Sequence, residues 1–564
     1  MRVWVLAACA LAAAGCTRCS DEMGARGEPG AAGLSAAGER PVRQLTIGIQ
    51  QEPDTLWGPF HEMMVAEEVL GTGQASLTVF DENWHIQPSA ALEIPTLENG
   101  GLQLIDGGSR MRTTWRIDPD LVWPDGVPVT ADDFVFAHQV VMDPRYEVAD
   151  RSVAEKVGSM RAEGADRRTL VVDWKQVYAF YHNYGNHLLL PRHVVQRLYN
   201  DHPEALVSDV FGTRPLLPGG FTVTDWVRGS HIVVERNSQA KGKWRPWFDR
   251  IVFRIIPSTA ALEANLVSGT IDAISTGWLP LDRVEALAGK HADTFDFHFV
   301  EGLTFEHIDC NLDNPILADV RVRRALLHAV DREQLARDLF GHDQPIAHSW
   351  VPPRRRDHNA AVRRYGYDPA LAARLLDEAG YIVGADGLRA RKGMPLKLSI
   401  MTTSGNATRE RIEQRLQSAW RQLGIELEIR NQPAKLFFTE TLRRRAFPAL
   451  AMYTWTLDPM HDSSTLWRCD QIPNAANGWR GQNYPGWCNE EVTALHRQIE
   501  RELDEDKRAD LLQHQQLLWA DALPVLPLYF QLEPSVTIKR LRGWKPTGTL
   551  VPVTWNATAW KFAD

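Results

Sequence analysis

The stretch TTWRIDPDLVWPDGVPVTADDFVFAHQVVMD at residues 113–143 decides the fold. Its first five residues alternate between polar and apolar, which is typical of a strand. The Pro-Asp-Gly at 124–126 predicts a tight turn in which glycine accepts a positive φ. Thr130 and Asp133 have the spacing of a capping box, and this predicts a helix over 134–141. We therefore expect a strand, a turn and a helix in this order.

A second readable stretch is DCNLDNPILADVRVRRALLHAVDREQLARDLF at 309–340. Asp319 stands at an N-cap position before apolar residues at helical spacing, and Asp331 with Gln334 predicts a capping box that starts a second helix. The opposite face carries arginines and a histidine. Such a face can contact nucleic acid or an anionic ligand, but it is most often a solvated surface.

Composition narrows the class of protein. A chain of 564 residues is too long for one ordinary core, so two or three structural units are expected. The hydrophobic content of 44% and charged content of 24% are those of a globular protein, and no internal run of 18 apolar residues occurs. The net charge of −9 argues against nucleic acid as the main partner.

The N-terminus predicts export. A short positive start and an apolar run at 3–14 lead to Ala13-Ala14-Gly15-Cys16. This pattern resembles a bacterial lipoprotein signal, which predicts a signal peptide at 1–15, a lipidated Cys16 and a flexible tether at 16–41 rich in Gly, Ala, Ser and charge. An ordinary secretory signal is the alternative. Either signal directs the protein out of the cytoplasm.

The cysteines fit an exported protein. Cys469 and Cys488 lie nineteen positions apart, and in an exported chain this favours a disulfide between them. Zinc is a poorer interpretation, because neither cysteine belongs to a short-spaced pair with a neighbouring histidine pair. Cys310 is predicted to be a buried thiol. Cys19 lies in the tether and has no evident partner.

The order of several motifs resembles one family. The 113–143 stretch contains W-x-DG-x-P-V-TA-D-D-F, which resembles the signature region of the bacterial extracellular solute-binding proteins of family 5, the peptide, dipeptide and nickel receptors of ATP-driven importers. Segments within 212–272 continue the resemblance, although Gly-Gly-Phe at 219–221 replaces the usual Gly-Pro-Tyr. The 309–340 stretch and the YDP…GY segment at 367–381 follow in the family's order.

The resemblance implies a two-lobed α/β periplasmic binding protein fold, class II-like and of the large type with an extra inserted domain, in which helices flank mixed sheets. The implied units are lobe I at 42–85, 212–302 and 527–564, an inserted subdomain of lobe I at 86–211, and lobe II at 303–526.

The resemblance also implies a ligand site within MYTWTLDPMHDSSTL at 452–466. In the family's peptide receptors the aspartate of a W-x-x-D motif pairs with the ligand's ammonium group, and Trp455 and Asp458 reproduce that spacing. A buried ammonium needs a fixed anion, because burying it alone costs several kcal/mol. Asp462 is the reserve anion, since this segment is shorter than in dipeptide receptors. Tyr453, Thr454 and Trp57 are contributors by family position.

Plainer interpretations of these residues stay open. The Asp-Pro and serines of 458–464 are also typical of a solvated turn, and Trp455 either stacks on a ligand or packs between strands. The sequence lacks the nucleophile elbow, the zinc-hydrolase helix and the phosphate and dinucleotide loops of common enzymes. We therefore predict no catalytic residues, no metal and no cofactor.

The predicted function is that of a substrate-binding receptor. It would capture di- or oligopeptides in an inter-lobe cleft by hinge closure and deliver them to the permease subunits of an ABC transporter, as a monomer anchored by lipid in the periplasm or on the outer face of the cell membrane. The alternatives are a nickel complex, haem or another small solute as ligand, or a sensor or chaperone without transport.

Overall fold

The computed structural model describes residues 42–563 apart from 61–62, 147, 149–150, 185–188, 208–211, 342–343, 458, 461–462 and 550. The predicted signal peptide, the tether, Cys16 and Cys19 lie outside the described residues, as do Asp458 and Asp462. Residues from Arg43 onward form a single unit. None of its described helices is long and apolar enough to cross a membrane.

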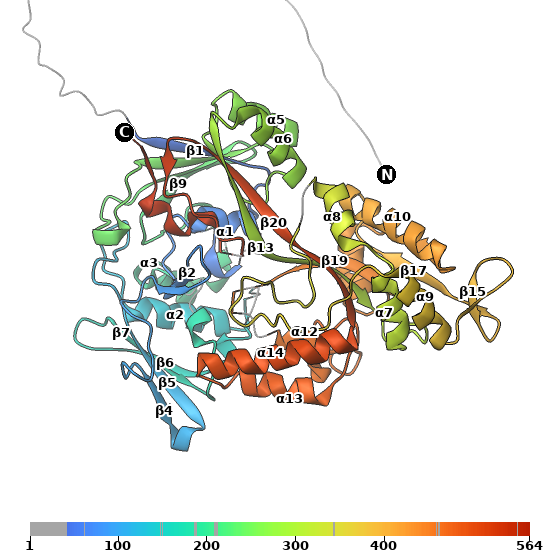
Figure 1. Ribbon diagram of the computed structural model, residues 1–564. Coiled ribbons are helices and arrows are strands. Elements are labelled where there is room, and N and C mark those ends of the chain that lie inside the picture. The colour runs from blue at the N-terminus through green and yellow to red at the C-terminus, as the bar shows by residue number, and fades with distance from the viewer. Residues whose placement is uncertain are drawn as a thin grey trace, which may run out of the picture. The chain divides into compact units, whose positions relative to one another are not determined.

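A ten-stranded mixed sheet, in the order β18-β17-β19-β13-β20-β12-β1-β11-β10-β9, runs through this unit (Figure 1). Its two longest strands, β13 and β20, pair antiparallel at the centre. The strands of this sheet are β1 (Gln44–Ile49), β9 (Phe221–Val227), β10 (His231–Arg236), β11 (Arg250–Ile255), β12 (Ala273–Ile274), β13 (Phe295–Cys310), β17 (Lys397–Met401), β18 (Glu426–Ile429), β19 (Leu450–Thr456) and β20 (Val525–Ile538).

The other described strands form four smaller sheets. One has four strands in the order β4-β5-β7-β6, and the others have two or three. Their strands are β2 (Thr78–Phe80), β3 (Ile86–Pro88), β4 (Leu102–Ile105), β5 (Arg110–Arg116), β6 (Val157–Glu163), β7 (Thr169–Trp174), β14 (Ile382–Val383), β15 (Arg389–Arg391), β16 (Met394–Pro395), β21 (Leu541–Arg542) and β22 (Lys561–Phe562).

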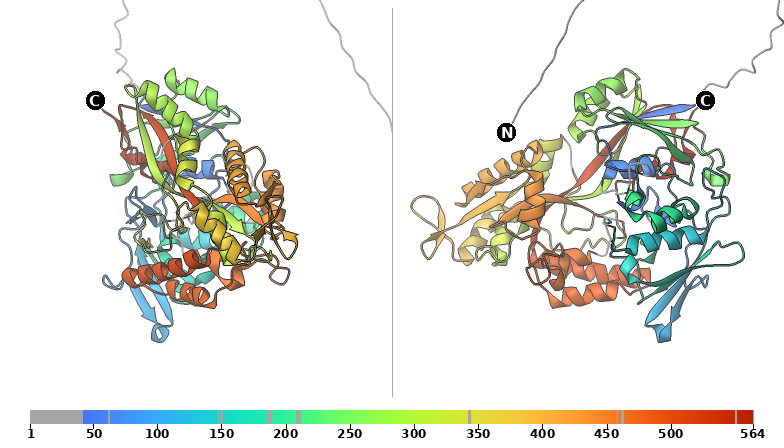
Figure 2. Two further views of the ribbon diagram at one scale, coloured as in Figure 1. Left: turned by 45° about the vertical axis from the view of Figure 1, so that its right-hand side comes forward. Right: turned by 180° about the vertical axis from the view of Figure 1, so that it is seen from behind.

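The described helices flank these sheets (Figures 1 and 2). They are α1 (Met64–Leu70), α2 (Ala131–Met142), α3 (Arg192–Asp201), α5 (Thr259–Val267), α6 (Leu281–His291), α7 (Val320–His328), α8 (Arg332–Phe340), α9 (Pro369–Glu378), α10 (Ala407–Gln422), α11 (Ala434–Leu436), α12 (Ser464–Trp467), α13 (Glu490–Ile499) and α14 (Glu505–Ala522).

The 113–143 stretch folds as its sequence predicts, with one difference in length. The strand is β5, and Gly126 takes the expected positive φ of 88°. The Thr130 N–H donates to Asp133 Oδ2 at 2.9 Å, so the capping box forms. The helix α2 begins at Ala131, directly after the cap, and so starts earlier than the predicted 134.

The helix pair at 309–340 is only partly as predicted. The Asp319 carboxylate accepts from the Arg321 N–H and caps α7. Asp331 accepts from the Gln334 N–H at 2.9 Å and caps α8, but the Gln334 side chain donates to Asp338 instead of returning to the cap, so half of the predicted box is formed. On the basic face Arg324 pairs with an Asp521 oxygen 2.9 Å away. This arginine is therefore engaged within the protein.

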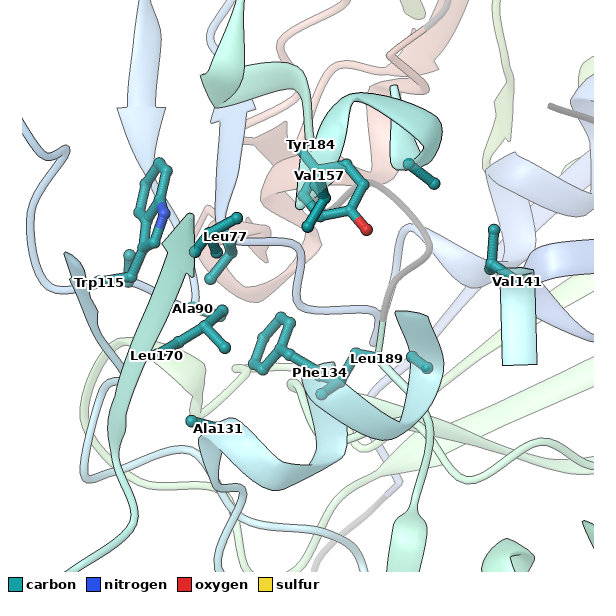
Figure 3. Close-up of a cluster of buried hydrophobic side chains, with 14 of the residues drawn as sticks. Leu77, Ala90, Trp115, Ala131, Phe134, Val141, Val157, Leu170, Tyr184 and Leu189 are labelled. Carbon is teal, nitrogen blue, oxygen red and sulfur yellow. The ribbon is translucent and has the colours of Figure 1, made fainter. Parts of the chain in front are cut away.

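The three largest clusters of buried apolar side chains among the described residues lie at different places in the fold. One surrounds β1 and β9–β12, a second surrounds β17–β19 with α7–α10, and a third surrounds β5–β7 and α2. Figure 3 shows part of the third cluster, in which Trp115, Phe134 and Leu170 come from a strand, a helix and a neighbouring strand. Buried residues of α13 and α14 join this cluster.

Candidate functional site

The strands β13, β19 and β20 place alternate side chains on two opposite faces. Thr304 lies opposite Thr456, Phe305 opposite Trp455, and Glu306 opposite both Thr454 and Tyr529. Because successive side chains of a strand point to opposite faces, directly paired residues share a face. We call the set Thr304, Glu306, Thr454, Thr456, Tyr529, Gln531 and Glu533 the polar face. The set Phe305, His307, Tyr453, Trp455 and Phe530 is the aromatic face.

A buried ion pair dominates the polar face. Arg409 Nε lies 2.9 Å from Glu306 Oε1, and the two side chains are 10% and 3% exposed. Arg409 comes from the first turn of α10, where the Asn406 side chain accepts its N–H at 3.0 Å. Gln531 Nε2 donates to the second Glu306 oxygen at 3.1 Å. Both charges therefore have partners, as burial requires.

A second carboxylate on this face has a perturbed pKa. Glu533 Oε1 accepts from the Thr304 hydroxyl at 2.9 Å, and the side chain is half-buried. Burial raises the pKa of Glu533 to about 7, against the opposing effect of the Thr304 hydrogen bond. This carboxyl group is therefore partly protonated near neutral pH.

The polar face forms one wall of a cavity of about 740 Å³, which we call the polar cavity. Its other walls come from the ends of β1, α6, α8 and α10 and from α1. Within it Glu68 of α1 is 4% exposed and accepts from the Trp278 indole N–H at 2.8 Å. Burial raises the pKa of Glu68 to about 7.

Aromatic rings and a carboxylate make up the opposite face. The Tyr453 hydroxyl donates to Asp309 Oδ2 at 2.6 Å, and burial raises the pKa of Tyr453 well above its usual value. Trp455 stacks on Tyr484, with ring centroids 6.1 Å apart and planes at 17°. Trp455 is only partly buried, whereas Tyr453 beside it is 1% exposed.

The segment 457–467 follows directly from the aromatic face. Leu457 is buried beside Phe305 and Phe530, and Met460 packs against the cluster that contains Trp57. Ser463 has a left-handed φ of 55°, and its hydroxyl accepts from the Trp350 indole N–H at 2.8 Å. The segment therefore connects the crossing strands to the cluster around β5–β7.

The structure separates the residues that the sequence groups together. Thr454 is on the polar face and lines the polar cavity, whereas Tyr453 and Trp455 are on the aromatic face. Tyr453 is 1% exposed, and Trp57 is 3% exposed inside the cluster around β5–β7. Sequence reasoning did not single out Glu306, Arg409, Glu533 or Tyr484. The two-residue period of 304–307 and 453–456 is the signal that would have separated the polar face from the aromatic face.

Cys469 and Cys488 form a disulfide with Cα atoms 4.5 Å apart. The loop that it closes carries Tyr484 onto Trp455. Among the described residues, the group with metal-ligand spacing consists of these two cysteines and Glu490, and its sulfurs are already bonded to each other. Cys310 is a free, buried cysteine, as predicted.

The chain is similar in sequence to known solute-binding proteins. The family model described as bacterial extracellular solute-binding proteins, family 5 (middle), matches residues 110–475. The chain is 24% identical over 519 residues to the oligopeptide-binding protein AppA of Bacillus subtilis (strain 168), covering 88% of this chain and 89% of that protein.

Solved structures are similar over nearly the whole chain. The oligopeptide-binding protein from Thermus thermophilus, complexed with a pentapeptide, is 28% identical with a TM-score of 0.73 and covers 92% of this chain and 96% of its own. NikZ from Campylobacter jejuni, in complex with Ni(L-His), is 21% identical with a TM-score of 0.73 and covers 92% of this chain and 100% of its own.

Proposed function

The chain belongs to family 5 of the bacterial extracellular solute-binding proteins, and on this premise we propose that it is the peptide-binding receptor of an ABC importer. Its fold is the two-lobed α/β periplasmic binding protein fold that the sequence predicts. The observation that carries the proposal is the 28% identity, over 92% of this chain, to an oligopeptide-binding protein complexed with a pentapeptide.

The ligand in this proposal is a di- or oligopeptide held on the aromatic face. Trp455 stacks on a ligand side chain, and Asp458, three residues later, pairs with the ligand's ammonium group. Asp462 is the alternative anion, and Trp57, in the buried cluster against which Met460 packs, is a further contributor. Thr454 turns its side chain to the polar face, so it is not part of the side-chain contacts that we propose for the peptide.

Capture involves closure of two lobes about the crossing strands. The proposed lobe I is 42–85, 212–302 and 527–564 with the insertion 86–211, and lobe II is 303–526. The separate buried clusters around β1 and around β17–β19 support this division, because each lobe then has a core of its own. The strands β13 and β20 join the two clusters, so changes in their backbone angles would move one lobe against the other.

The protein acts outside the cytoplasm, as its family does. We propose that Cys16 anchors it by lipid in the periplasm or on the outer face of the cell membrane, and that it works as a monomer with the permease subunits. The role is binding and delivery without covalent chemistry.

The test is to identify the bound solute. The exported chain is purified, the small molecules released on unfolding are determined by mass spectrometry, and the refolded protein is titrated with peptides of two to five residues by calorimetry. We expect released peptides and saturable binding of one peptide per chain. Release of a nickel complex, haem or another solute instead, with no peptide binding, would refute the peptide assignment, and absence of any ligand would favour a sensor or chaperone.

A further inference from the structure

The polar cavity is separated by the sheet from the face to which we assign the peptide. Thr304, Glu306 and Glu533 line it from β13 and β20, while Phe305 and Phe530 on the same strands point away. The helices α6 and α8 flank the crossing strands (Figures 1 and 2), and the first residues of α6 and the last of α8 line the cavity. A solute in this cavity would therefore not share the aromatic face.

The charges around the cavity are mostly negative. The acidic lining residues are Glu68 from α1, Asp282 from α6, Glu306 from β13 and Glu533 from β20, and the basic ones are Arg409 and Arg411 from α10. Glu306 and Arg409 neutralise each other at 2.9 Å. The remaining charges leave an excess of carboxylates, which favours a cationic solute.

Two buried polar atoms of the cavity wall have no hydrogen-bond partner among the described residues. They are Oε1 of Glu68 and the hydroxyl of Tyr529, whose residues are 4% and 0% exposed. Tyr529 shares its strand face with Glu533 and lies opposite Glu306. Buried polar atoms are normally paired, so these two atoms of the cavity wall have unused hydrogen-bonding capacity.

A single metal ion is a poor fit to this wall. Among the described residues, the carboxylates of the cavity do not form a group of three ligand atoms within 4.8 Å of one another. Apolar side chains, including Leu279, Phe340 and Val553, also line the cavity. A lining that combines carboxylates with apolar side chains matches an aliphatic chain that carries ammonium groups.

We propose that the polar cavity is a second binding site, for an aliphatic amine with one ammonium group on Glu68 and one on Glu533. The amine's methylene chain contacts the apolar lining, and its N–H groups donate to the carboxylates. Both carboxylates belong to the proposed lobe I, so the site does not require a particular solute on the aromatic face.

The perturbed carboxyl groups give the site a defined pH dependence. Both have a pKa near 7, and a bound ammonium favours their ionised forms, so binding releases protons. Affinity then rises between pH 6 and pH 8 by about tenfold for each carboxyl group that must ionise. The charged neighbours Asp282, Glu306, Arg409 and Arg411 face the same cavity.

The experiment titrates the full chain with 1,4-diaminobutane by calorimetry, with 1,4-butanediol as the neutral control. We expect saturable binding of the diamine, tighter at pH 8 than at pH 6, and none of the diol. Glu533→Gln and Glu68→Gln should each weaken diamine binding by about tenfold. The matched controls Glu301→Gln and Glu67→Gln remove the same charge from neighbouring positions outside the cavity lining and should leave the affinity unchanged.

A competition measurement separates this site from the peptide site. With a peptide ligand already bound, diamine binding should persist with an affinity of the same order. Displacement of the peptide by the diamine, no diamine binding, or equal effects of the cavity variants and their controls would each overturn the proposal. Failure of every tested peptide to bind would refute the proposed function. The diamine titration and its variants would still decide the proposal of a second site.

Discussion

The two faces of β13, β19 and β20 differ in the side chains that they carry. On the polar face, Glu306 and Arg409 are buried together and neutralise each other. On the aromatic face, Trp455 lies in a stacked pair of rings with Tyr484 and precedes an aspartate by three residues. One set of strands thus lines a charged cavity on one side and carries mostly buried aromatic rings on the other. The comparison teaches that neighbouring residues of a strand lie on faces of different chemistry.

The largest expected effect is on the polar face. Glu306→Leu leaves Arg409 buried without its carboxylate partner, which should reduce the free energy of unfolding by about 3–5 kcal/mol. Urea denaturation monitored by circular dichroism measures this free energy. The double variant Glu306→Leu with Arg409→Met removes both charges and should recover a large part of the loss. A single variant as stable as the wild type would show that the pair is not desolvated.

The next effect concerns the loop behind the aromatic face. Replacing Cys469 and Cys488 by serine opens a loop with a sequence separation of 19 and should reduce the free energy of unfolding by about 3 kcal/mol. Because this loop carries Tyr484 onto Trp455, peptide affinity should fall as well. The same denaturation experiment and a peptide titration measure the two effects. Reduced stability with unchanged peptide affinity would separate the loop from the ligand site.

Adjacent residues of β19 give the sharpest contrast between the faces. Trp455→Ala should weaken peptide binding by about tenfold or more, because an aromatic anchor is lost. Thr454→Val, one residue earlier, should change it by less than about twofold, since that side chain points into the polar cavity. Calorimetric titration with one peptide compares them. Equal losses would mean that both faces contact the peptide.

A smaller effect appears in the pH dependence of stability. The folded-state pKa of Glu533 is about 7, above its usual value of 4.5. Between pH 4.5 and pH 7 the folded state therefore holds a proton that the unfolded state has released, and this proton stabilises the folded state. The contribution of the protonated Glu533 carboxyl to the free energy of unfolding is fully present below pH 4.5 and is lost as pH rises through 7. Glu533→Gln stays neutral, so thermal unfolding should show the variant similar to the wild type at about pH 4.5 and more stable at about pH 8. A constant difference at all pH values would contradict the raised pKa.

Single helices and turns were predictable because their signals are local, whereas the two-lobed architecture was expected from the resemblance to a family. The capping box of Thr130 and Asp133 and the caps Asp319 and Asp331 act within a few residues, and the structure has all three caps. The loop closed by Cys469 and Cys488 was predictable from export and spacing.

The site was less predictable because its contacts are long-range. Glu306 and Arg409 are separated by 103 positions, and only the pairing of β13 with β19 brings them to Thr454. Sequence reasoning grouped Tyr453, Thr454 and Trp455 by family position. Their alternation along a strand is a local signal, and applying it would have assigned Thr454 to the other face.

The most direct test of the account compares one peptide in two forms, with a free and with an N-acetylated amino terminus, on the wild type and on Asp458→Ala. The account predicts that the substitution weakens binding of the free form by about a hundredfold, because its ammonium group loses its anion, and that it changes binding of the acetylated form by less than about threefold. An equal loss for both forms would contradict ammonium pairing at Asp458.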